Sequence, residues 1–494
     1  MKKINKCMLF LMSAVISLTT AVGAGCVGNG ANIDSNKVIP QFNGGEQFKI
    51  FADRPPTPNE KHLSVYKDAG FNYYVMTEDD YEFTDEQGNI TAKYAEGLNV
   101  CEELGLKVLI RNFRDDPDYF VNPVGGTKTN KDYLGNYISY FLPERNITTQ
   151  LQSFPAVAGY YMADEPTYTK ISELTKLVDW YNSYGNNTLF HINMTGSVLG
   201  TGLMEGHSYT DFITHYADTI LKKVNGPKTL SVDFYPLMEE GDGDKYLQKE
   251  ILSDYMVIAN KVKELNANLS GDNKVITNYC MQTFYSDAAG WGWRDLVAEN
   301  DVTFQTYLAT AFGAKAFEYY MYRGMNSDTS IVEALSQDPR PMYYWVQSAN
   351  AEMQEFAPVI LPFEWNGVRA YEGKQLGDPM NAQAFELIKD RQLEKFTFIS
   401  DVYARLDTLV SEHFDEDGNK AYLVMNYTEP TFNQTNYVTL TLNGVKQAVI
   451  YNAVEVEENG KTVVKLTRSV VDVVDGQIDL QILSGRAAFV YPVV

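Results

Sequence analysis

One pattern constrains the fold of this sequence more than any other feature: an amphipathic helix, a glycine and a short apolar strand follow one another repeatedly along the first 360 residues or so. The segments "HLSVYKDAGFN" (62–72) and "NVCEELGLKV" (99–108) each end a helix at a glycine and enter a strand. Helices and strands that alternate in this way are typical of βα units on a parallel sheet, because parallel strands need a crossover connection.

Eight segments have the length and apolar content of buried strands. They begin at Phe48, Asn72, Lys107, Ala158, Thr188, Thr229, Val275 and Ala314. Eight βα units predict an α/β fold of the closed (β/α)8 type, a TIM barrel. A doubly wound open sheet is the alternative, but no nucleotide-binding fingerprint favours it.

The pattern changes near residue 363. The rest of the chain consists of β-rich segments, such as "KAYLVMNYTE" and "NYVTLTLNG", separated by Asn-Gly and Asp-Gly turns. This pattern predicts a C-terminal antiparallel β-sandwich domain of about 130 residues. We therefore divide the chain into residues 1–25, 26–46, 47–362 (barrel) and 363–494 (sandwich).

The N-terminus has the features of an export signal. Basic residues open the chain, an apolar stretch follows, and Gly23-Ala24-Gly25 precede Cys26. This stretch resembles a bacterial lipobox, with Gly23 in place of the usual Leu. The resemblance implies cleavage of residues 1–25, lipidation of Cys26, and a flexible tether over 26–46 that holds the protein to the cell membrane or outer surface. Ordinary secretion with cleavage nearby is the alternative.

Composition narrows the classes of partner. The 494 residues carry a formal net charge of −23, which disfavours nucleic acid and anionic membrane and is compatible with a neutral sugar. The spacing of the histidines matches no zinc motif, and there is no Gly-rich phosphate loop. Cys101 and Cys280 fall in helical and strand patterns, as buried thiols do. No metal or cofactor is expected.

Function in a barrel of this type is expected at the C-terminal ends of the strands. In "GYYMADEP" (159–166), alternation places Tyr161, Ala163 and Glu165 on one face. Small residues suit the barrel interior, so Glu165 is predicted to point inward at the rim, directly before Pro166 ends the strand. The alternative is that Asp164 and Glu165 only begin a charged helix.

Two further acids are predicted to face the axis. Alternation places Asp233 on the sixth strand and Glu318 on the eighth. We expect Asp233 at the rim, because Tyr235 and Pro236 follow it closely, and Glu318 one or two layers deeper. The fourth and sixth strands are not neighbours, so a wide separation of the Glu165 and Asp233 carboxyl groups is expected. Among enzymes that cleave glycosidic bonds with two carboxyl groups, a wide separation is typical of those that invert the anomeric configuration. The alternative is that both acids are structural: Asp233 would cap a helix or loop, and Glu318 would form an ion pair with Lys315 or Arg323.

Polar and aromatic residues at the strand ends are candidates for binding substrate, since aromatic rings can stack on sugars. The candidates are Asp164, Asn112, Asn193, Tyr235, Gln282, Tyr285, Trp291, Trp293 and Tyr322.

Several motifs together carry a resemblance to a known family. "DRPPTPNEKHLSVYKDAGFN", "YYMADEP", "DFYP" and "QTYLATAFGAKAFEYYMY" resemble the barrels of clan-A-type glycoside hydrolases, broadly the family 42 β-galactosidase-like group. The resemblance implies that Glu165 is the acid/base. It also implies a nucleophilic Glu on the seventh strand, where this chain has Gln282, so Asp233 or Glu318 must supply the second carboxylate.

The sequence therefore predicts a tethered glycoside hydrolase that acts on a neutral oligo- or polysaccharide, with Glu165, Asp233 and Glu318 as candidate catalytic residues. The alternative is a non-catalytic glycan-binding surface lipoprotein on a degenerate barrel. Neither the sugar nor the oligomeric state follows from the sequence.

Overall fold

The structure is a computed structural model that describes residues 46–494 apart from the gaps given below. Three of the predicted functional residues, Cys26, Asn112 and Trp291, lie outside the described residues. In the part of the chain that is described, no helix is both long and apolar enough to span a membrane. The gaps are 78–80, 84, 86–88, 112–146, 185–186, 241–242, 286–291, 325–328, 376 and 459.

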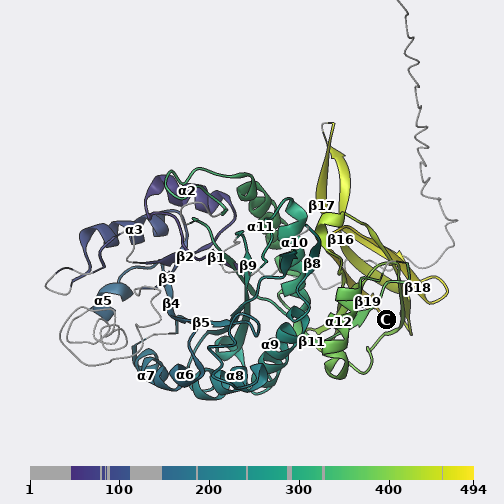
Figure 1. The fold of residues 1–494 in the computed structure, drawn as a ribbon, viewed down its shortest axis with the longest axis horizontal. Helices are drawn as coiled ribbons and strands as arrows, with labels where there is room; N and C mark the ends of the chain where they lie inside the picture. The colour runs from purple at the N-terminus through teal and green to yellow at the C-terminus, as the bar shows by residue number, and fades with distance from the viewer. Residues whose placement is uncertain are drawn as a thin grey trace, which may run out of the picture. The chain divides into compact units, whose positions relative to one another are not determined.

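Eight parallel strands form one sheet within the described residues, in the order β1-β10-β9-β6-β5-β4-β3-β2. The strands are β1 (Lys49–Ala52), β2 (Tyr73–Met76), β3 (Lys107–Ile110), β4 (Val157–Asp164), β5 (Leu189–Thr195), β6 (Lys228–Asp233), β9 (Val275–Gln282) and β10 (Ala316–Tyr320). Asn72 joins the first strand to the second, because its N–H donates to the Ile50 carbonyl (3.1 Å) and its Oδ1 accepts from the Ile50 N–H (2.8 Å). The predicted (β/α)8 barrel is confirmed (Figure 1).

Helices surround the strands (Figure 1). They are α2 (Glu60–Asp68), α3 (Ala92–Glu103), α5 (Ile147–Gln152), α6 (Tyr168–Glu173), α7 (Thr175–Tyr184), α8 (Tyr209–Tyr216), α9 (Ile251–Asn266), α10 (Glu299–Ala311) and α11 (Pro341–Ile360). The predicted glycine stops are present: Gly70 and Gly105 follow α2 and α3 with φ of 85° and 69°, a conformation that glycine adopts without steric cost.

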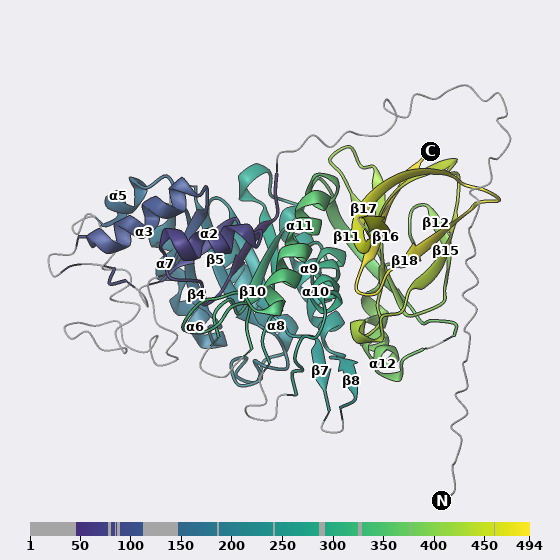
Figure 2. The ribbon, with the colours of Figure 1, turned by 90° about the horizontal axis from the view of Figure 1, so that it is seen from above.

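A small antiparallel hairpin follows the sixth barrel strand. It pairs β7 (Leu237–Glu239) with β8 (Lys245–Leu247), and Figure 2 shows it projecting from one end of the barrel. Residue Trp293 forms an isolated bridge with Met238 on β7. The hairpin therefore fixes part of the chain that follows β9.

The C-terminal domain is the predicted antiparallel sandwich. One sheet has the order β11-β13-β14-β19-β16-β17 and the other β12-β15-β18. The strands are β11 (Glu364–Tyr371), β12 (Ile399–Ala404), β13 (Thr408–Phe414), β14 (Lys420–Asn426), β15 (Asn436–Leu442), β16 (Gln447–Glu458), β17 (Lys461–Asp472), β18 (Gln477–Ile482) and β19 (Ala487–Val493). Buried Val424, Leu440 and Val490 pack between the sheets. Helix α12 (Pro379–Ile388) was not expected from the sequence.

Candidate active site

A buried arginine organises the mouth of the barrel. Arg111 follows β3, and its Nη1 lies 2.8 Å from Asp53 Oδ1 and its Nη2 lies 3.2 Å from Asp164 Oδ2. Its guanidinium also lies 4.4 Å from the centroid of the Tyr161 ring. A buried cation needs such partners, so Arg111 ties the ends of β1, β3 and β4 together.

Asp164 is fixed by several donors. Besides Arg111, the Tyr161 hydroxyl donates to its Oδ1 (3.1 Å) and so does Nδ2 of Asn193 (3.2 Å). A carboxylate that accepts this many hydrogen bonds is fixed in its orientation. Asp164 therefore suits the role of a structural anchor for the neighbouring Glu165.

Glu165 directly follows the last residue of β4, at the point where the chain leaves the strand. Its backbone N–H donates to the Asn193 carbonyl (2.9 Å), and its φ of 41° is in the left-handed region that non-glycine residues rarely adopt. The side chain is partly exposed. Strained backbone at a strand end is common where a side chain must be aimed at a substrate.

The carboxyl groups of Glu165 and Asp233 are in hydrogen-bond contact. Burial raises the pKa of Asp233 well above its usual range, and the charges of Glu165 and Asp164 raise it further. Because a carboxyl donates only when it is protonated, the contact requires the two groups to share one proton.

This contact corrects one expectation. The sequence favoured the wide separation of an inverting pair, roughly 6.5–9.5 Å, whereas the two carboxyl groups interact directly. Strands β4 and β6 are separated by β5 alone, so side chains that point inward from their ends can meet across the barrel mouth.

Glu318 lies inside the barrel. It is 1% exposed, accepts from Asn278 Nδ2 (3.3 Å), and its Oε2 is 3.5 Å from Nε2 of His191. Burial raises the pKa of Glu318 to about 8; the charge of Asp53 adds to the shift and that of Arg111 opposes it. Its hydrogen-bond and ionic contacts among the described residues are with interior side chains, which suits a positioning role.

Amide and hydroxyl groups connect these acids. Ser231 Oγ donates to Asn193 Oδ1 (2.8 Å) and accepts from Asn278 Nδ2 (2.8 Å). Asn193, a predicted substrate-binding residue, thus uses both ends of its amide inside the protein. The network links Asp164 at the rim to Glu318 in the interior.

Aromatic side chains form a wall beside the carboxyl pair, which we define as Tyr235, Phe284, Trp293 and Tyr320. The Tyr235 ring centroid lies 4.9 Å from that of Phe284 and 5.5 Å from that of Trp293, both edge to face. The Tyr235 hydroxyl lies 3.4 Å from Asp233 Oδ2. Trp293 and Tyr320 are partly exposed, so the wall offers apolar ring surface next to the acids.

Gln282 does not face the mouth with a free amide. Its Nε2 donates to the carbonyls of Phe284 (3.2 Å) and Arg294 (2.9 Å), and its Oε1 accepts from the Leu237 N–H (3.4 Å). The residue is fully buried. These bonds hold the segment after β9 against β7, and they leave no part of the Gln282 amide for a substrate.

The outcome for the two remaining tyrosines is different: Tyr322 departs from expectation, and Tyr285 stays a candidate. Tyr322 is buried against Tyr66 and Phe71 on the helix side of the sheet, because β10 ends at Tyr320 and strand alternation no longer applies beyond it. Tyr285 is 39% exposed, and its backbone N–H donates to Thr329 Oγ1 (2.7 Å).

Three residues of the network, Asp53, Arg111 and His191, were not predicted from the sequence, and Tyr161 was predicted only to share a face with Glu165. A charged residue at the end of an apolar strand was the available indication for Asp53 in "FKIFAD" and Arg111 in "KVLIRNF". His191 lies within the apolar segment "TLFHINM", where it is most simply a core residue.

Among the residues that the structure describes, no group of three or more His, Cys, Asp or Glu side chains could hold a metal ion. Cys101 and Cys280 are buried free thiols, and burial raises the pKa of each. A buried thiol of raised pKa is a poor nucleophile, so the chemistry of the site rests on the carboxyl groups.

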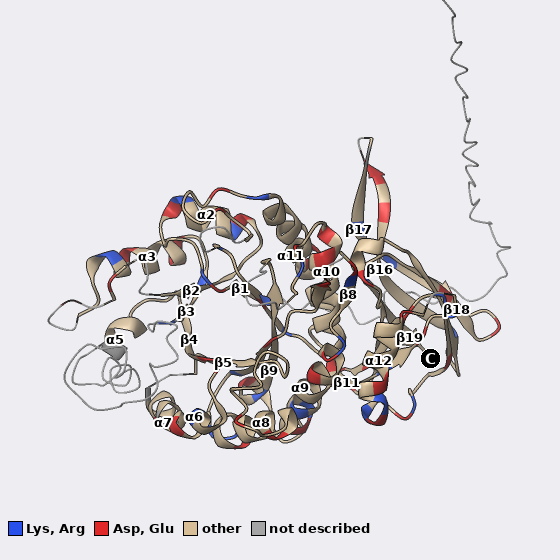
Figure 3. Ribbon diagram, in the orientation of Figure 1, with Lys and Arg blue, Asp and Glu red and all other residues tan. Residues whose placement is uncertain are grey.

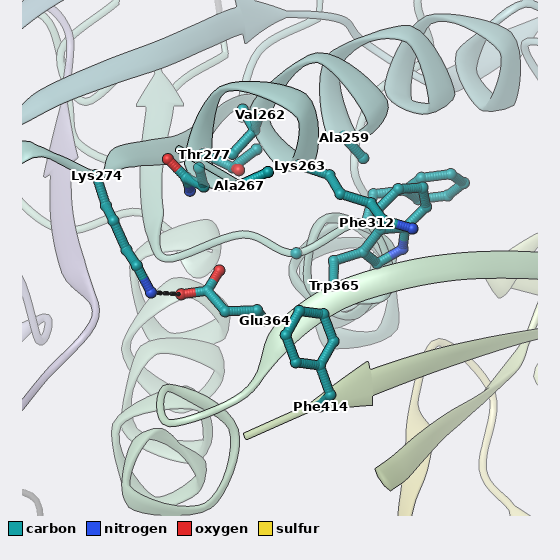
Figure 4. Close-up of a pocket in the computed structure, with 12 residues that line it drawn as sticks. Ala259, Val262, Lys263, Ala267, Lys274, Thr277, Phe312, Glu364, Trp365 and Phe414 are labelled. Atoms are coloured by element: carbon teal, nitrogen blue, oxygen red, sulfur yellow. Dashed lines mark hydrogen bonds and ion pairs between the residues drawn. The ribbon is translucent and has the colours of Figure 1, made fainter. Parts of the chain in front are cut away.

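A separate cavity of about 240 Å³ lies between α9, α10 and the start of the C-terminal sandwich (Figure 4). Phe312, Trp365 and Phe414 supply its aromatic lining, and Lys274 pairs with Glu364 at one side (3.3 Å). None of the carboxyl groups of the barrel mouth lines it. The cavity is therefore separate from the carboxyl groups of the barrel mouth.

No known family profile matches the sequence, and no curated protein matches it significantly. Among solved structures, the chain is similar to a family 5 glycoside hydrolase from Bacteroides vulgatus (10% identity, 90% of this chain and 89% of that chain, TM-score 0.48). It is also similar to a family 39 glycoside hydrolase from Bacteroides cellulosilyticus (13%, 90% and 80%, 0.46) and to a GH30 endoxylanase from Clostridium papyrosolvens (10%, 91% and 97%, 0.42). With identities this low and TM-scores below 0.5, these similarities identify no reaction or substrate for this chain.

Proposed function

We propose that this protein is a glycoside hydrolase that acts on a neutral oligo- or polysaccharide, with Glu165 as general acid and Asp233 as the second carboxyl group. The observation that carries the proposal is the contact of these two groups at the mouth of the barrel. Glycoside hydrolysis needs one protonated and one ionised carboxyl at the working pH.

The environment of the pair supplies that state. Two carboxylates in contact cannot both ionise at neutral pH at low cost, so one proton stays on the pair. Asp233 is buried, whereas Glu165 is partly exposed. Glu165 is therefore the member that can carry the proton to a glycosidic oxygen.

A productive complex requires the pair to open. Neither a water molecule nor an anomeric carbon fits between carboxyl groups in contact. Glu165, at the end of β4, can rotate away when a sugar enters, while Asp233 stays fixed by burial and by Tyr235. Since burial favours the neutral form of Asp233, the proposal requires the proton to pass from Asp233 to Glu165 as the sugar enters.

The surroundings suit a neutral sugar. The aromatic wall gives a ring surface on which a pyranose can stack. The net charge of −23 disfavours polyanionic substrates, and acidic side chains recur on the outer helices and along the β16–β17 hairpin (Figure 3).

The test is hydrolysis of a panel of aryl glycosides and natural oligosaccharides by the wild type, Glu165→Gln and Asp233→Asn, with glycan binding measured separately by calorimetry. We expect Glu165→Gln to lower turnover by about 10²–10⁴-fold while binding is retained. Glu173→Gln, on the exposed surface of α6, is the matched control and should leave turnover unchanged. Near-normal turnover in Glu165→Gln on an unactivated substrate would refute the assignment.

Two observations favour a second candidate, a non-catalytic glycan-binding protein. The two carboxyl groups interact directly, without the wide separation of an inverting pair, and Gln282 occupies the seventh-strand position where the family resemblance implies a nucleophile. This candidate predicts glycan binding without turnover. Binding that both acid variants retain, with no hydrolysis of any panel member by the wild type, would support it.

A further inference from the structure

Arg294 is a fully buried cation in the segment that follows β9. Asp301, in the first turn of α10, holds both of its terminal nitrogens: Oδ2 lies 3.0 Å from Nη1 and Oδ1 lies 2.6 Å from Nη2. Oε1 of Glu429 lies 2.5 Å from the same Nη2. The Arg294 side chain is thus fixed by two acids, one from the barrel and one from the C-terminal domain.

Glu429 is itself held in place. It is 1% exposed and immediately precedes the short 3-10 turn Pro430–Phe432 that follows β14. Its Oε2 accepts hydrogen bonds from the backbone N–H (2.8 Å) and the hydroxyl of Thr431. Both carboxylate oxygens are therefore engaged, and the group is oriented toward Arg294 in advance.

Trp293 and Arg294 contact different parts of the structure from neighbouring positions in the chain. Residue 293 bridges β7, and the Arg294 N–H donates to the Leu237 carbonyl (3.1 Å). In paired extended chain, successive side chains point to opposite sides. Arg294 points to Asp301 and Glu429, and Trp293 packs on Tyr235 in the aromatic wall.

We propose that Glu429 is a positioning residue for the glycan site: through Arg294 it holds Trp293 in the aromatic wall, so the C-terminal sandwich completes the substrate surface of the barrel. The inference rests on the proposed function in one respect, namely that the ligand of the wall is a glycan. Glu429 itself does not touch the substrate.

The first experiment separates binding from chemistry. Glu429→Gln keeps the shape of the side chain and removes its charge. Because Trp293 stacks on the sugar and takes no part in bond cleavage, KM and the glycan Kd should rise about two- to tenfold with kcat within twofold. A fall in kcat with unchanged KM would overturn the proposal.

The chain offers a matched control. Arg486 and Glu352 form a second buried pair between the C-terminal domain and the barrel (Nε to Oε2, 3.1 Å), on helix α11 rather than in the Trp293 segment. Glu352→Gln should weaken the domain contact but leave KM and Kd unchanged. An equal rise in KM in Glu352→Gln would show general loosening and overturn the proposal.

A double-mutant cycle tests the route through Trp293. In a Trp293→Ala background, Glu429→Gln should raise Kd no further, because the group that it positions is gone. Fully additive effects would show that Glu429 acts elsewhere.

A readout that needs no substrate keeps this proposal distinct from the function. The near-UV circular dichroism of Trp293, defined as the difference between the wild type and Trp293→Phe, should be lost in Glu429→Gln and kept in Glu352→Gln. If the protein binds no glycan, the proposed function fails but this difference still tests the link. An unchanged spectrum in Glu429→Gln overturns the link even if hydrolysis is found.

Discussion

Nε2 of His191 lies 3.5 Å from Oε2 of Glu318 in the interior of the barrel, and the two side chains are 0% and 1% exposed. Burial and the charge of Arg111 lower the pKa of His191 to about 3, while burial and then Asp53 raise that of Glu318 to about 8. At neutral pH both groups are therefore uncharged. A protonated Glu318 can donate to Nε2, an atom that otherwise has no hydrogen-bond partner among the described residues.

The first prediction concerns stability against pH. Since the folded pKa of Glu318 is about 8 and its ordinary value 4.5, the folded state holds a proton that the unfolded state releases between these values. The stability from this proton is complete below about pH 4.5 and is lost as pH rises through about 8, at roughly 1.4 kcal/mol per pH unit. The side chain of residue 318 cannot titrate in Glu318→Gln. The free energy of unfolding of this variant in urea should therefore rise relative to that of the wild type from pH 5 to pH 8. If the free energies of unfolding of the two proteins changed equally with pH, Glu318 would be ionised in the folded wild type across this range.

The second prediction is that the buried Asp233 carboxyl group lowers the stability of the folded protein at alkaline pH. Burial and the charges of Glu165 and Asp164 raise the pKa of Asp233, so ionising it at alkaline pH costs folding free energy. Asp233→Asn removes this cost, and we expect its unfolding midpoint at pH 8 to rise by about 2–4 °C while turnover is lost. The gain should shrink as the pH falls toward 3.8, the ordinary value for Asp, because the unfolded state then holds the proton as well. Asp179→Asn on the exposed face of α7 should change neither quantity.

Arg111 should be essential to the fold of the mouth. Arg111→Met leaves Asp53 and Asp164 without their shared cation, which should cost about 3–5 kcal/mol in urea unfolding at pH 7. Arg340→Met, which removes a more exposed pair with Glu333, should cost about 0–1 kcal/mol.

A second variant makes the Arg111 prediction specific. Adding Asp53→Asn to Arg111→Met should recover part of the loss, because one unpaired buried charge is then gone. Asp53→Asn in the wild-type background should instead destabilise the protein. Equal effects of Asp53→Asn in both backgrounds would mean that the ion pair contributes nothing.

Strand alternation predicted part of this site. It placed Glu165 and Asp233 on inward faces of β4 and β6, and the structure brings the two together. The alternation of side chains holds there because Asp233 belongs to a regular strand and Glu165 directly follows one. It fails for Tyr322, which lies beyond the end of β10, where the period of two no longer holds.

The rest of the site depends on contacts between strands that no single segment encodes. Arg111 pairs with Asp53 and Asp164, which lie 58 and 53 residues away. The contact between Glu165 and Asp233 joins the ends of two strands that are not neighbours in the sheet. The orientation of the Gln282 amide is set by hydrogen bonds to the backbone carbonyls of Phe284 and Arg294. The family 42 resemblance remains a prediction.

The last prediction concerns the N-terminus, which lies outside the described residues. We propose that Cys26 carries lipid and tethers the protein to the cell membrane or outer surface, on the basis of the basic, apolar and small-residue order of residues 1–25. One acyl chain binds membrane only marginally, whereas two or more hold a protein stably. Cys26→Ser, expressed in the native host, should therefore move the protein from the membrane fraction to the soluble fraction or block its processing. Cys101→Ser, which changes a buried thiol of the barrel, is the control and should leave the distribution unchanged. Mass spectrometry of the mature N-terminus decides the chemistry: an acylated Cys26 is expected, and a free, unmodified N-terminus on wild-type protein found in the medium would show that ordinary secretion is the correct reading.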